Sequence, residues 1–312
     1  MKVYFSLEDF QKLDFAAVTT GTFDGVHIGH NKILEQLNQA AATIGGESVL
    51  LTFSPHPRIV LQPDVDLKLL STQKEKIELL KNTGLDHLII HPFTKEFSRT
   101  SSLDFVRNIL VNNIGAKKLV IGYDHHFGRN REGSFEHLKE FGPTYGFEVE
   151  EISAKDIEDV TVSSTKIRRA LNEGDLETAN EYLGYDYPIT GQVVEGEKIG
   201  NTIGFPTANL VAEETYKLIP MDGVYAVEVQ FPSALEQKFQ GMCNIGMRPT
   251  FSGKFKTIEV HIFNFNRNIY GEQMQIVFKR RLRGETKFDS IEALKTQLNN
   301  DMEHARKVLS SH

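Results

Sequence analysis

The hydrophobic and polar positions follow two different rhythms along the chain. From residue 1 to about residue 185, short apolar stretches alternate with longer stretches in which apolar residues recur at helical spacing. The strand-like runs include FAAVTTG, SVLLTF, LDHLIIHPF and AKKLVIGYD, and the helix-like runs, several of which close at glycine, include HNKILEQLNQAAATIG, STQKEKIELLKNTG and SSLDFVRNILVNNIG. This alternation predicts a parallel sheet covered by helices on both faces.

The pattern changes after residue 185. Turn residues now separate six short strand candidates: ITGQVVEG, FPTANLV, GVYAVEVQF, FQGMCNIG, TIEVHIFNF and QMQIVFKRRL. The last segment, FDSIEALKTQLNNDMEHARKVL, has the periodicity of one long helix. We therefore expect an α/β domain over residues 1–185 and, over 186–312, a six-stranded antiparallel β-barrel with a long terminal helix.

Composition narrows the class of protein. The chain has 312 residues and a net charge of −7, from 35 basic and 42 acidic residues, which disfavours a nucleic-acid partner held by phosphate contacts. The single Cys243 excludes an intramolecular disulfide and fits a reducing compartment. Neither a signal peptide nor a membrane-length apolar run is visible, so we expect a cytoplasmic protein without a membrane partner. Its oligomeric state cannot be read from the sequence.

The first strand candidate leads into TTGTFDGVHIGH, residues 19–30. Glycines at Gly21, Gly25 and Gly29 let backbone approach a phosphate, and a following helix N-terminus attracts its charge. His27 and His30 lie three apart and share a helix face, from which both can bind the oxygens of a triphosphate. The dinucleotide and P-loop motifs are absent. Two histidines at a turn are also compatible with solvent exposure or with a helix N-cap.

A second motif, VTVSSTKIRRAL, spans residues 160–171. Ser164 and Thr165 offer hydroxyl and backbone N–H groups to phosphate at a helix start, and Arg168 faces the same anion. Taken alone, this motif reads as an ordinary N-cap with a solvated arginine. Paired with the first motif, it predicts the second half of a triphosphate site.

The two motifs together resemble the nucleotidyltransferase superfamily that shares its fold with class I tRNA synthetases, although the lysine loop of those synthetases is absent. GYDHHFGRNREGS (122–134) is similar to the FGxxRxG loop of the bacterial FMN adenylyltransferases, which TFSPHP (52–57) and FSRTSSLDF (97–105) also match. The resemblance implies a Rossmann-like parallel sheet. It also implies that ATP is bound by the following residues: Gly21, Phe23, Gly25, His27, His30, Asp124, Ser164, Thr165 and Arg168.

The segment GNTIGFPTANL, residues 200–210, resembles the signature of riboflavin kinase. Thr207 and Asn209 are two apart, so on an extended chain both side chains point the same way. They offer the neutral oxygens that Mg²⁺ beside ATP phosphates accepts. Gly204 and Pro206 are expected to shape this ATP- and Mg²⁺-binding loop. Without the resemblance, the stretch reads as a turn followed by a strand with surface Thr and Asn.

In TIEVHIFNF, residues 257–265, Glu259 alternates with an apolar face. The resemblance implies that Glu259 is the general base, because the 5′-hydroxyl of riboflavin must lose its proton during phosphoryl transfer. The segments NIGMRPTF, PMDGVYAV and LRGETKF complete the kinase pattern. Flavin contacts are expected from Asn244, Arg248 and Arg283.

The resemblance runs through nearly the whole chain in the expected order, and the chain is identified as a member of the bacterial bifunctional riboflavin kinase/FMN adenylyltransferase (FAD synthetase) family. This implies phosphorylation of riboflavin by ATP in the barrel, adenylylation of FMN by ATP in the α/β domain, and Mg²⁺ in both steps. The chain departs from the usual pattern at Asn201, at Glu195 and at Asp124-His125.

Three alternatives remain open at this point. A monofunctional FMN adenylyltransferase with an impaired barrel is favoured only by Asn201. A small tRNA synthetase needs a lysine loop and a tRNA partner. A flavin-binding sensor that consumes no ATP leaves Glu259 and Thr207 without a role.

Overall fold

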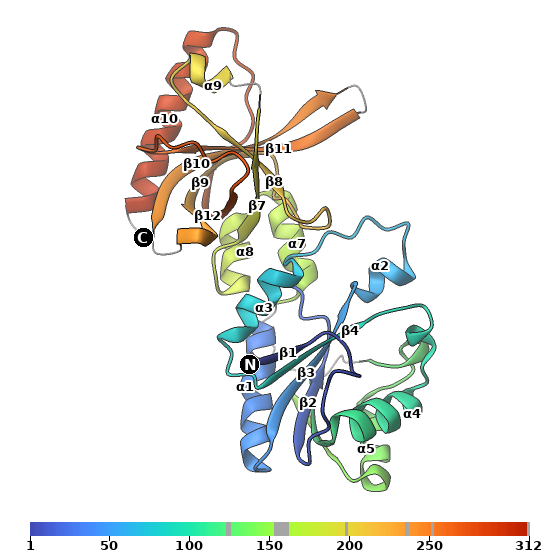
Figure 1. Ribbon diagram of the computed structural model, residues 1–312. Helices are drawn as coiled ribbons and strands as arrows, with labels where there is room; N and C mark the ends of the chain where they lie inside the picture. Colours follow the sequence, from blue (N-terminus) through green and yellow to red (C-terminus); the bar gives the residue numbers. More distant parts are fainter. Residues whose placement is uncertain (123–125, 153–161, 197–198, 235–236, 251–252, 311–312) are drawn as a thin grey trace. The chain divides into compact units, whose positions relative to one another are not determined.

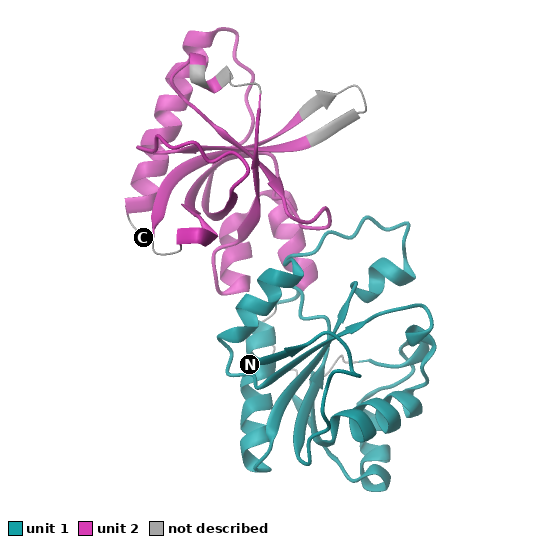
Figure 2. Ribbon diagram, viewed as in Figure 1, with its two compact units in different colours: residues 1–163 teal, residues 164–312 magenta. Residues whose placement is uncertain are grey.

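The computed structural model describes residues 1–122, 126–152, 162–196, 199–234, 237–250 and 253–310. The side chains of 199, 201, 248–250 and 253–255 are also outside this description. The chain divides into two compact units, Met1–Ser163 and Ser164–His312 (Figure 2).

The first unit is built on a six-stranded sheet of order β1-β4-β3-β2-β5-β6 (Figure 1), in which every pairing is parallel. Its strands are β1 (Lys2–Tyr4), β2 (Ala16–Thr20), β3 (Glu47–Ser54), β4 (His87–Pro92), β5 (Ala116–Gly122) and β6 (Glu148–Ile152). From β2 the chain adds β3 and β4 on one side and β5 and β6 on the other. The strand order thus reverses between β2 and β5, and open α/β sheets bind ligands at the carboxyl ends of strands at such a point.

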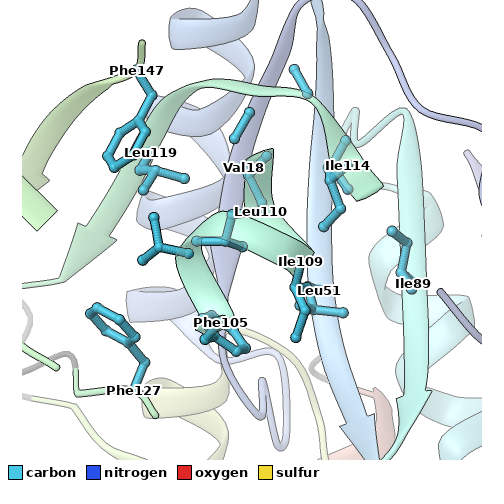
Figure 3. Packing of buried hydrophobic residues seen from close by; sticks show 14 of the residues in the cluster. Val18, Leu51, Ile89, Phe105, Ile109, Leu110, Ile114, Leu119, Phe127 and Phe147 are labelled. Atoms are coloured by element: carbon cyan, nitrogen blue, oxygen red, sulfur yellow. The ribbon is translucent and has the colours of Figure 1, made fainter. Parts of the chain in front are cut away.

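Alternating side chains of these strands enter two separate cores. Val18, Leu51, Ile89 and Leu119 pack with residues of the helix at 105–114 on one face (Figure 3). Ala17, Leu50, Leu88 and Val120 pack on the other face against the helices that begin at 28 and 73. The helical segments of this unit are α1 (Ile28–Thr43), α2 (Pro57–Leu61), α3 (Gln73–Lys81), η1 (Phe97–Arg99), α4 (Ser102–Asp104), the π-helix η2 (Phe105–Ile114), η3 (Arg129–Arg131) and α5 (Phe135–Tyr145). The predicted parallel sheet with two covered faces is confirmed.

The second unit contains a closed six-stranded barrel of order β10-β11-β8-β7-β12-β9, in which every pairing is antiparallel. Its strands are β7 (Pro188–Val194), β8 (Ala208–Ala212), β9 (Gly223–Gln230), β10 (Lys238–Thr250), β11 (Gly253–Ile262) and β12 (Gln273–Arg283). Its helices are α7 (Ser164–Glu173), α8 (Leu176–Leu183), α9 (Ile199–Thr202), η4 (Pro232–Ala234) and α10 (Ile291–Ser310). Ala305, Val308 and Leu309 of α10 pack on Ala226 and Met242. The predicted barrel with a long terminal helix is confirmed.

Helices α7 and α8 belong to the same compact unit as the barrel. Asn180 of α8 donates a hydrogen bond to the carbonyl of Phe278 at 3.0 Å and accepts one from the N–H of Tyr187 at 3.0 Å. The Tyr187 hydroxyl donates to the carbonyl of Leu218 at 2.8 Å. These contacts join α8 to the barrel, whereas the sequence pattern placed the domain boundary after residue 185.

We expect a fragment of residues 164–312 to be more stable than a fragment of residues 186–312. Cutting at 186 removes Asn180 and leaves two backbone groups of the barrel without their partner, at about 1–3 kcal/mol for each buried group. Urea unfolding of both fragments measures the difference in free energy of unfolding. Equal values would show that α7 and α8 contribute nothing to the barrel.

Candidate active sites

The turn that follows β2 is held in an unusual conformation. Phe23 and Val26 have φ angles of 46° and 38°, in a region that costs a non-glycine residue on the order of 1–3 kcal/mol. The carboxylate of Asp24, 1% exposed, accepts backbone N–H bonds from Leu70 at 3.0 Å and from Ser71 at 3.2 Å. A buried carboxylate therefore fastens this strained turn to the loop in front of α3.

His27 and His30 close the first turn of α1 by capping each other. The N–H of His30 donates to Nδ1 of His27, and the N–H of His27 donates to Nδ1 of His30, both at 3.3 Å. The two rings stack 3.6 Å apart, and His30 also stacks on Phe23 at 4.6 Å. Because each Nδ1 accepts a hydrogen bond, each neutral ring carries its proton on Nε2. The sequence left open solvent exposure, an N-cap or a phosphate ligand; the cap forms, and His27 is buried rather than solvent-exposed.

The charge state of His30 is fixed by its surroundings. Burial lowers the pKa of His30 well below 6.5, and a positive charge on Lys76, or on His27 when that ring is protonated, lowers it further. The ring is therefore neutral at physiological pH. A neutral imidazole can donate through Nε2 without the desolvation cost of a buried cation.

Lys76 of α3 is a site residue that the sequence analysis missed. It is 9% exposed, and its Nζ donates to the carbonyl of Thr22 at 2.7 Å. Burial lowers the pKa of Lys76, while the carboxylate of Asp24 acts in the opposite direction. In the sequence this lysine reads as one of several charges on a solvated helix face. The fold instead places its ammonium behind the turn that carries the two histidines.

We expect Lys76→Met to lower the kcat/KM of the reaction at this site about tenfold, because a positive charge beside the anion site is lost; tenfold corresponds to ~1.4 kcal/mol. The same variant should raise the pKa of His30, measured by NMR titration, since the Lys76 charge lowers it. Lys81→Met is the control, because Lys81 lies on the same helix but pairs with Glu78 in solvent. An unchanged His30 pKa would remove Lys76 from the site.

The second motif lies at the start of α7. Ser164 and Arg168 are half-buried and four residues apart, so they share one face, and Thr165 is exposed. Just before α7, the carbonyl of Val162 lies 3.9 Å from where a Cβ on Gly29 of α1 would be. Val162, near the end of the first unit, therefore lies close to the first motif.

Three stretches that resemble FMN adenylyltransferases converge in the first unit. Phe53 of TFSPHP lies 5.5 Å from Phe97 of FSRTSSLDF, between ring centroids. Phe105, from the same stretch as Phe97, lies 5.7 Å from Phe127 of the FGxxRxG loop. The N–H of Arg129 in that loop also donates to the carbonyl of Thr100 at 2.8 Å. A continuous aromatic cluster thus joins segments that are far apart in the sequence.

In the barrel, three polar residues lie in one row across neighbouring strands. Asn209 of β8 pairs with Glu259 of β11, which pairs with Asn244 of β10. Directly paired residues of an antiparallel sheet project from the same face. All three are half-buried, and their neighbours in sequence are buried: Ala208, Leu210, Cys243, Ile245, Ile258 and Val260. The carboxylate of Glu259 thus has an amide side chain on either side.

Glycines bring backbone close to this row. A Cβ on Gly196 would overlap the amide of Asn209, and a Cβ on Gly200 would lie 3.6 Å from Oγ1 of Thr207. Nδ1–H of His261 donates to the carbonyl of Pro206 at 2.7 Å and fixes the segment before β8. No role was predicted for His261, which the alternation of β11 places on the same face as Glu259.

A cavity of about 260 Å³ opens beside Thr207 and Pro206. Its other walls are apolar residues of β7, β8 and β11 and the segment Phe265–Tyr270. The sequence analysis assigned no role to that segment, which has no motif of its own. The cavity thus has walls of mixed polar and apolar character next to the Oγ1 of Thr207.

Two family models match the chain. The model described as FAD synthetase matches residues 10–166, and the model described as riboflavin kinase matches residues 183–309. A protein of Buchnera aphidicola named bifunctional riboflavin kinase/FMN adenylyltransferase is 37% identical over 315 residues, covering 99% of each chain. The chain belongs to this bifunctional family.

Further relatives support this family assignment. Proteins with the same name from Listeria monocytogenes and Escherichia coli K12 are 39% and 35% identical, covering 92% and 93% of this chain and 90% and 91% of their own. A crystal structure from Streptococcus pneumoniae described as a macrolide-efflux protein matches with a TM-score of 0.86 and 33% identity over 98% of both chains. Within the described residues, no helix is both long enough and apolar enough to span a bilayer.

The three residues expected to bind flavin in such a kinase differ in what the structure shows of their surroundings. Asn244 lies in the polar row. The guanidinium of Arg283 binds both carboxylate oxygens of Asp301 in α10, at 2.7–3.1 Å, and Asp301 is 4% exposed. This arrangement ties β12 to α10. The side chain of Arg248, like Asp124 and the side chain of Asn201, is outside the described residues.

Proposed function

We propose that the chain performs two successive ATP-dependent reactions on a flavin. The barrel phosphorylates riboflavin to FMN, and the α/β domain transfers AMP from ATP to FMN, giving FAD and pyrophosphate. The observation that carries this proposal is the tandem match of an FAD synthetase model over residues 10–166 and a riboflavin kinase model over residues 183–309. We keep 1–185 and 186–312 as the proposed functional domains, with α7 and α8 packed on the second.

In the barrel we propose that Glu259 accepts the proton of the ribityl 5′-hydroxyl as its oxygen attacks the γ-phosphorus of ATP. Asn244 and Asn209 flank this carboxylate and orient the groups on either side of it. The cavity beside Thr207 is the proposed site for the adenosine of ATP, since its walls combine apolar side chains with the polar groups of Asn266 and Asn268 and it lies next to the ATP-binding loop.

Mg²⁺ fits the residues of this loop. Thr207 and Asn209 present neutral oxygens on alternate positions, and Gly196 and Gly200 leave room that a side chain would fill. Within the described residues, no cluster of three or more His, Cys, Asp or Glu side chains offers an all-protein site. Thr207 and Asn209 would hold the ion together with phosphate oxygens, and the bound ion would offset negative charge on the transferred group.

The adenylyl transfer needs no general base. The second pKa of a phosphate monoester is ~6, so the phosphate of FMN is already largely ionised at neutral pH. The site must align this phosphate with the α-phosphorus of ATP and stabilise the leaving pyrophosphate. We assign that role to the Nε2–H donors of His27 and His30, supported by Lys76 behind their turn, and to Ser164, Thr165 and Arg168. The aromatic cluster around Phe97 is the proposed contact for the isoalloxazine ring.

Incubation with riboflavin, ATP and Mg²⁺, followed by chromatography of the flavins, tests both steps. FMN should appear first and FAD after it. FAD formed from supplied FMN but not from riboflavin would favour the monofunctional adenylyltransferase with an impaired barrel. No product from either flavin would reject the proposal. A cytoplasmic location without nucleic-acid or membrane partners stays a prediction from the sequence.

A further inference from the structure

Arg281 of β12 lies between two glycines from different parts of the second unit. A Cβ on Gly174, the residue after α7, would lie 3.0 Å from its Cζ and Nε, and a Cβ on Gly223 would lie 3.0 Å from its Nε. Gly174 has φ +78° and Gly223 has φ +153°, conformations that side chains rarely adopt. The backbone of two segments far apart in the sequence therefore approaches the guanidinium of Arg281 closely.

Hydrogen bonds extend this contact into α7. Nη2 of Arg281 donates to the carbonyl of Asp222 at 2.9 Å. Next to it, the N–H of Met221 donates to the carbonyl of Leu171 in the last turn of α7 at 2.9 Å. The carbonyls of a last helical turn have no partner within the helix, and a cation near that end is favourable. Arg281 and Met221 therefore hold the C-terminal end of α7.

The loop that carries Met221 is itself fixed to the barrel. Nζ of Lys256 in β11 donates to the carbonyl of Pro220 at 2.8 Å and pairs with the carboxylate of Asp222 at 3.3 Å. The hydroxyl of Tyr225, a fully buried residue, donates to the carbonyl of Met221. Hydrogen bonds and an ion pair therefore connect residues 219–223 to the strands of the barrel and to α7.

We propose that Arg281, a residue of the kinase barrel, is a positioning residue for adenylyl transfer. It acts through α7, whose first turn carries Ser164, Thr165 and Arg168. Leu171 lies seven residues after Ser164, so about 10 Å of helix at 1.5 Å per residue connects the held end to the phosphate-binding end. This inference rests on the proposed role of α7 in binding the triphosphate.

The test compares Arg281→Ala and Arg281→Lys in the full chain, with ATP and supplied FMN or riboflavin. Misplacing a binding group by about 1 Å can cost up to ~10²-fold in rate. We expect Arg281→Ala to lower kcat/KM for ATP in adenylyl transfer about 10- to 100-fold, through a higher KM for ATP. Riboflavin phosphorylation should stay within about twofold. Arg281→Lys should recover part of the loss, because a lysine can reach the Asp222 carbonyl but lacks the flat guanidinium that the two glycines approach.

Two further variants separate the possible outcomes. Lys279→Ala, on the same strand, removes an ion pair with Asp186 without touching α7, and should leave both activities unchanged. A merely structural role for Arg281 would lower kcat of both reactions by one factor and leave both KM values unchanged, which would overturn the inference. Arg168→Ala tests the premise: if it is neutral, the proposed function of α7 fails. If it impairs adenylyl transfer and Arg281→Ala does not, only the inference on Arg281 fails.

Discussion

Replacing Glu259 by glutamine is expected to lower riboflavin phosphorylation by ~10²–10⁴-fold, the usual contribution of a general base. Glutamine has nearly the same shape and can keep its place between Asn209 and Asn244, but it cannot accept the hydroxyl proton. Adenylylation of supplied FMN should continue at the wild-type rate, because its nucleophile is already ionised. The measurement is the rate of FMN formation from riboflavin and ATP, with FAD formation from FMN measured in parallel.

Glu228→Gln is the matched control for this variant. Glu228 lies on β9 of the same barrel, where it pairs with Lys279 at 3.5 Å, away from the polar row. Its replacement should leave phosphorylation unchanged. The pH profile gives an independent reading, since the acid limb of kcat/KM that reports an essential base should disappear in Glu259→Gln. If phosphorylation persists undiminished, Glu259 is only a solvated strand residue.

The architecture could be predicted because its signals are local. Apolar periodicity and closing glycines mark each helix and strand, and the change of period near 185 marks the change of architecture. The alternation in TIEVHIFNF predicted an apolar face next to Glu259, and Ile258, Val260 and Ile262 form that buried face. The division between Ser163 and Ser164 was not predicted, because α7 and α8 continue the helical rhythm of the first half of the sequence but pack with the second unit.

Candidate site residues could be predicted where they belong to a contiguous sequence motif. His27, His30 and the residues around Thr207 stand in contiguous signatures. Lys76 and Arg281 could not be found in this way, since each acts through contacts with segments far away in sequence. In the sequence alone, Lys76 reads as one charge on a helix face, and Arg281 reads as one of several basic residues at the end of a strand. In the folded chain, Lys76 is buried behind the turn at Thr22, and the backbone at Gly174 and Gly223 comes close to the side chain of Arg281.

His30→Ala is the second change with a large expected effect. Removing one donor to a developing anionic charge typically costs ~10²–10³-fold in rate. We therefore expect FAD formation from FMN to fall by that factor while FMN formation stays near wild type. The variant also loses the acceptor for the N–H of His27, which costs helix α1 about 1 kcal/mol. His87→Ala is the control, because His87 is a buried histidine of the same unit, bonded to Glu47 and Tyr4 and outside the proposed site.

The pH dependence of stability separates the two consequences of this change. The pKa of His30 is well below 6.5 in the folded chain, because the ring is buried, and close to 6.5 when unfolded. Between these values the unfolded chain binds more protons, so the free energy of unfolding should fall as the pH drops below about 6.5 and level off above it. In His30→Ala this slope should be shallower, whereas the loss of FAD formation should be the same at pH 7 and pH 8. A loss of activity that follows the stability curve instead would mean that His30 only caps α1 and does not bind the triphosphate.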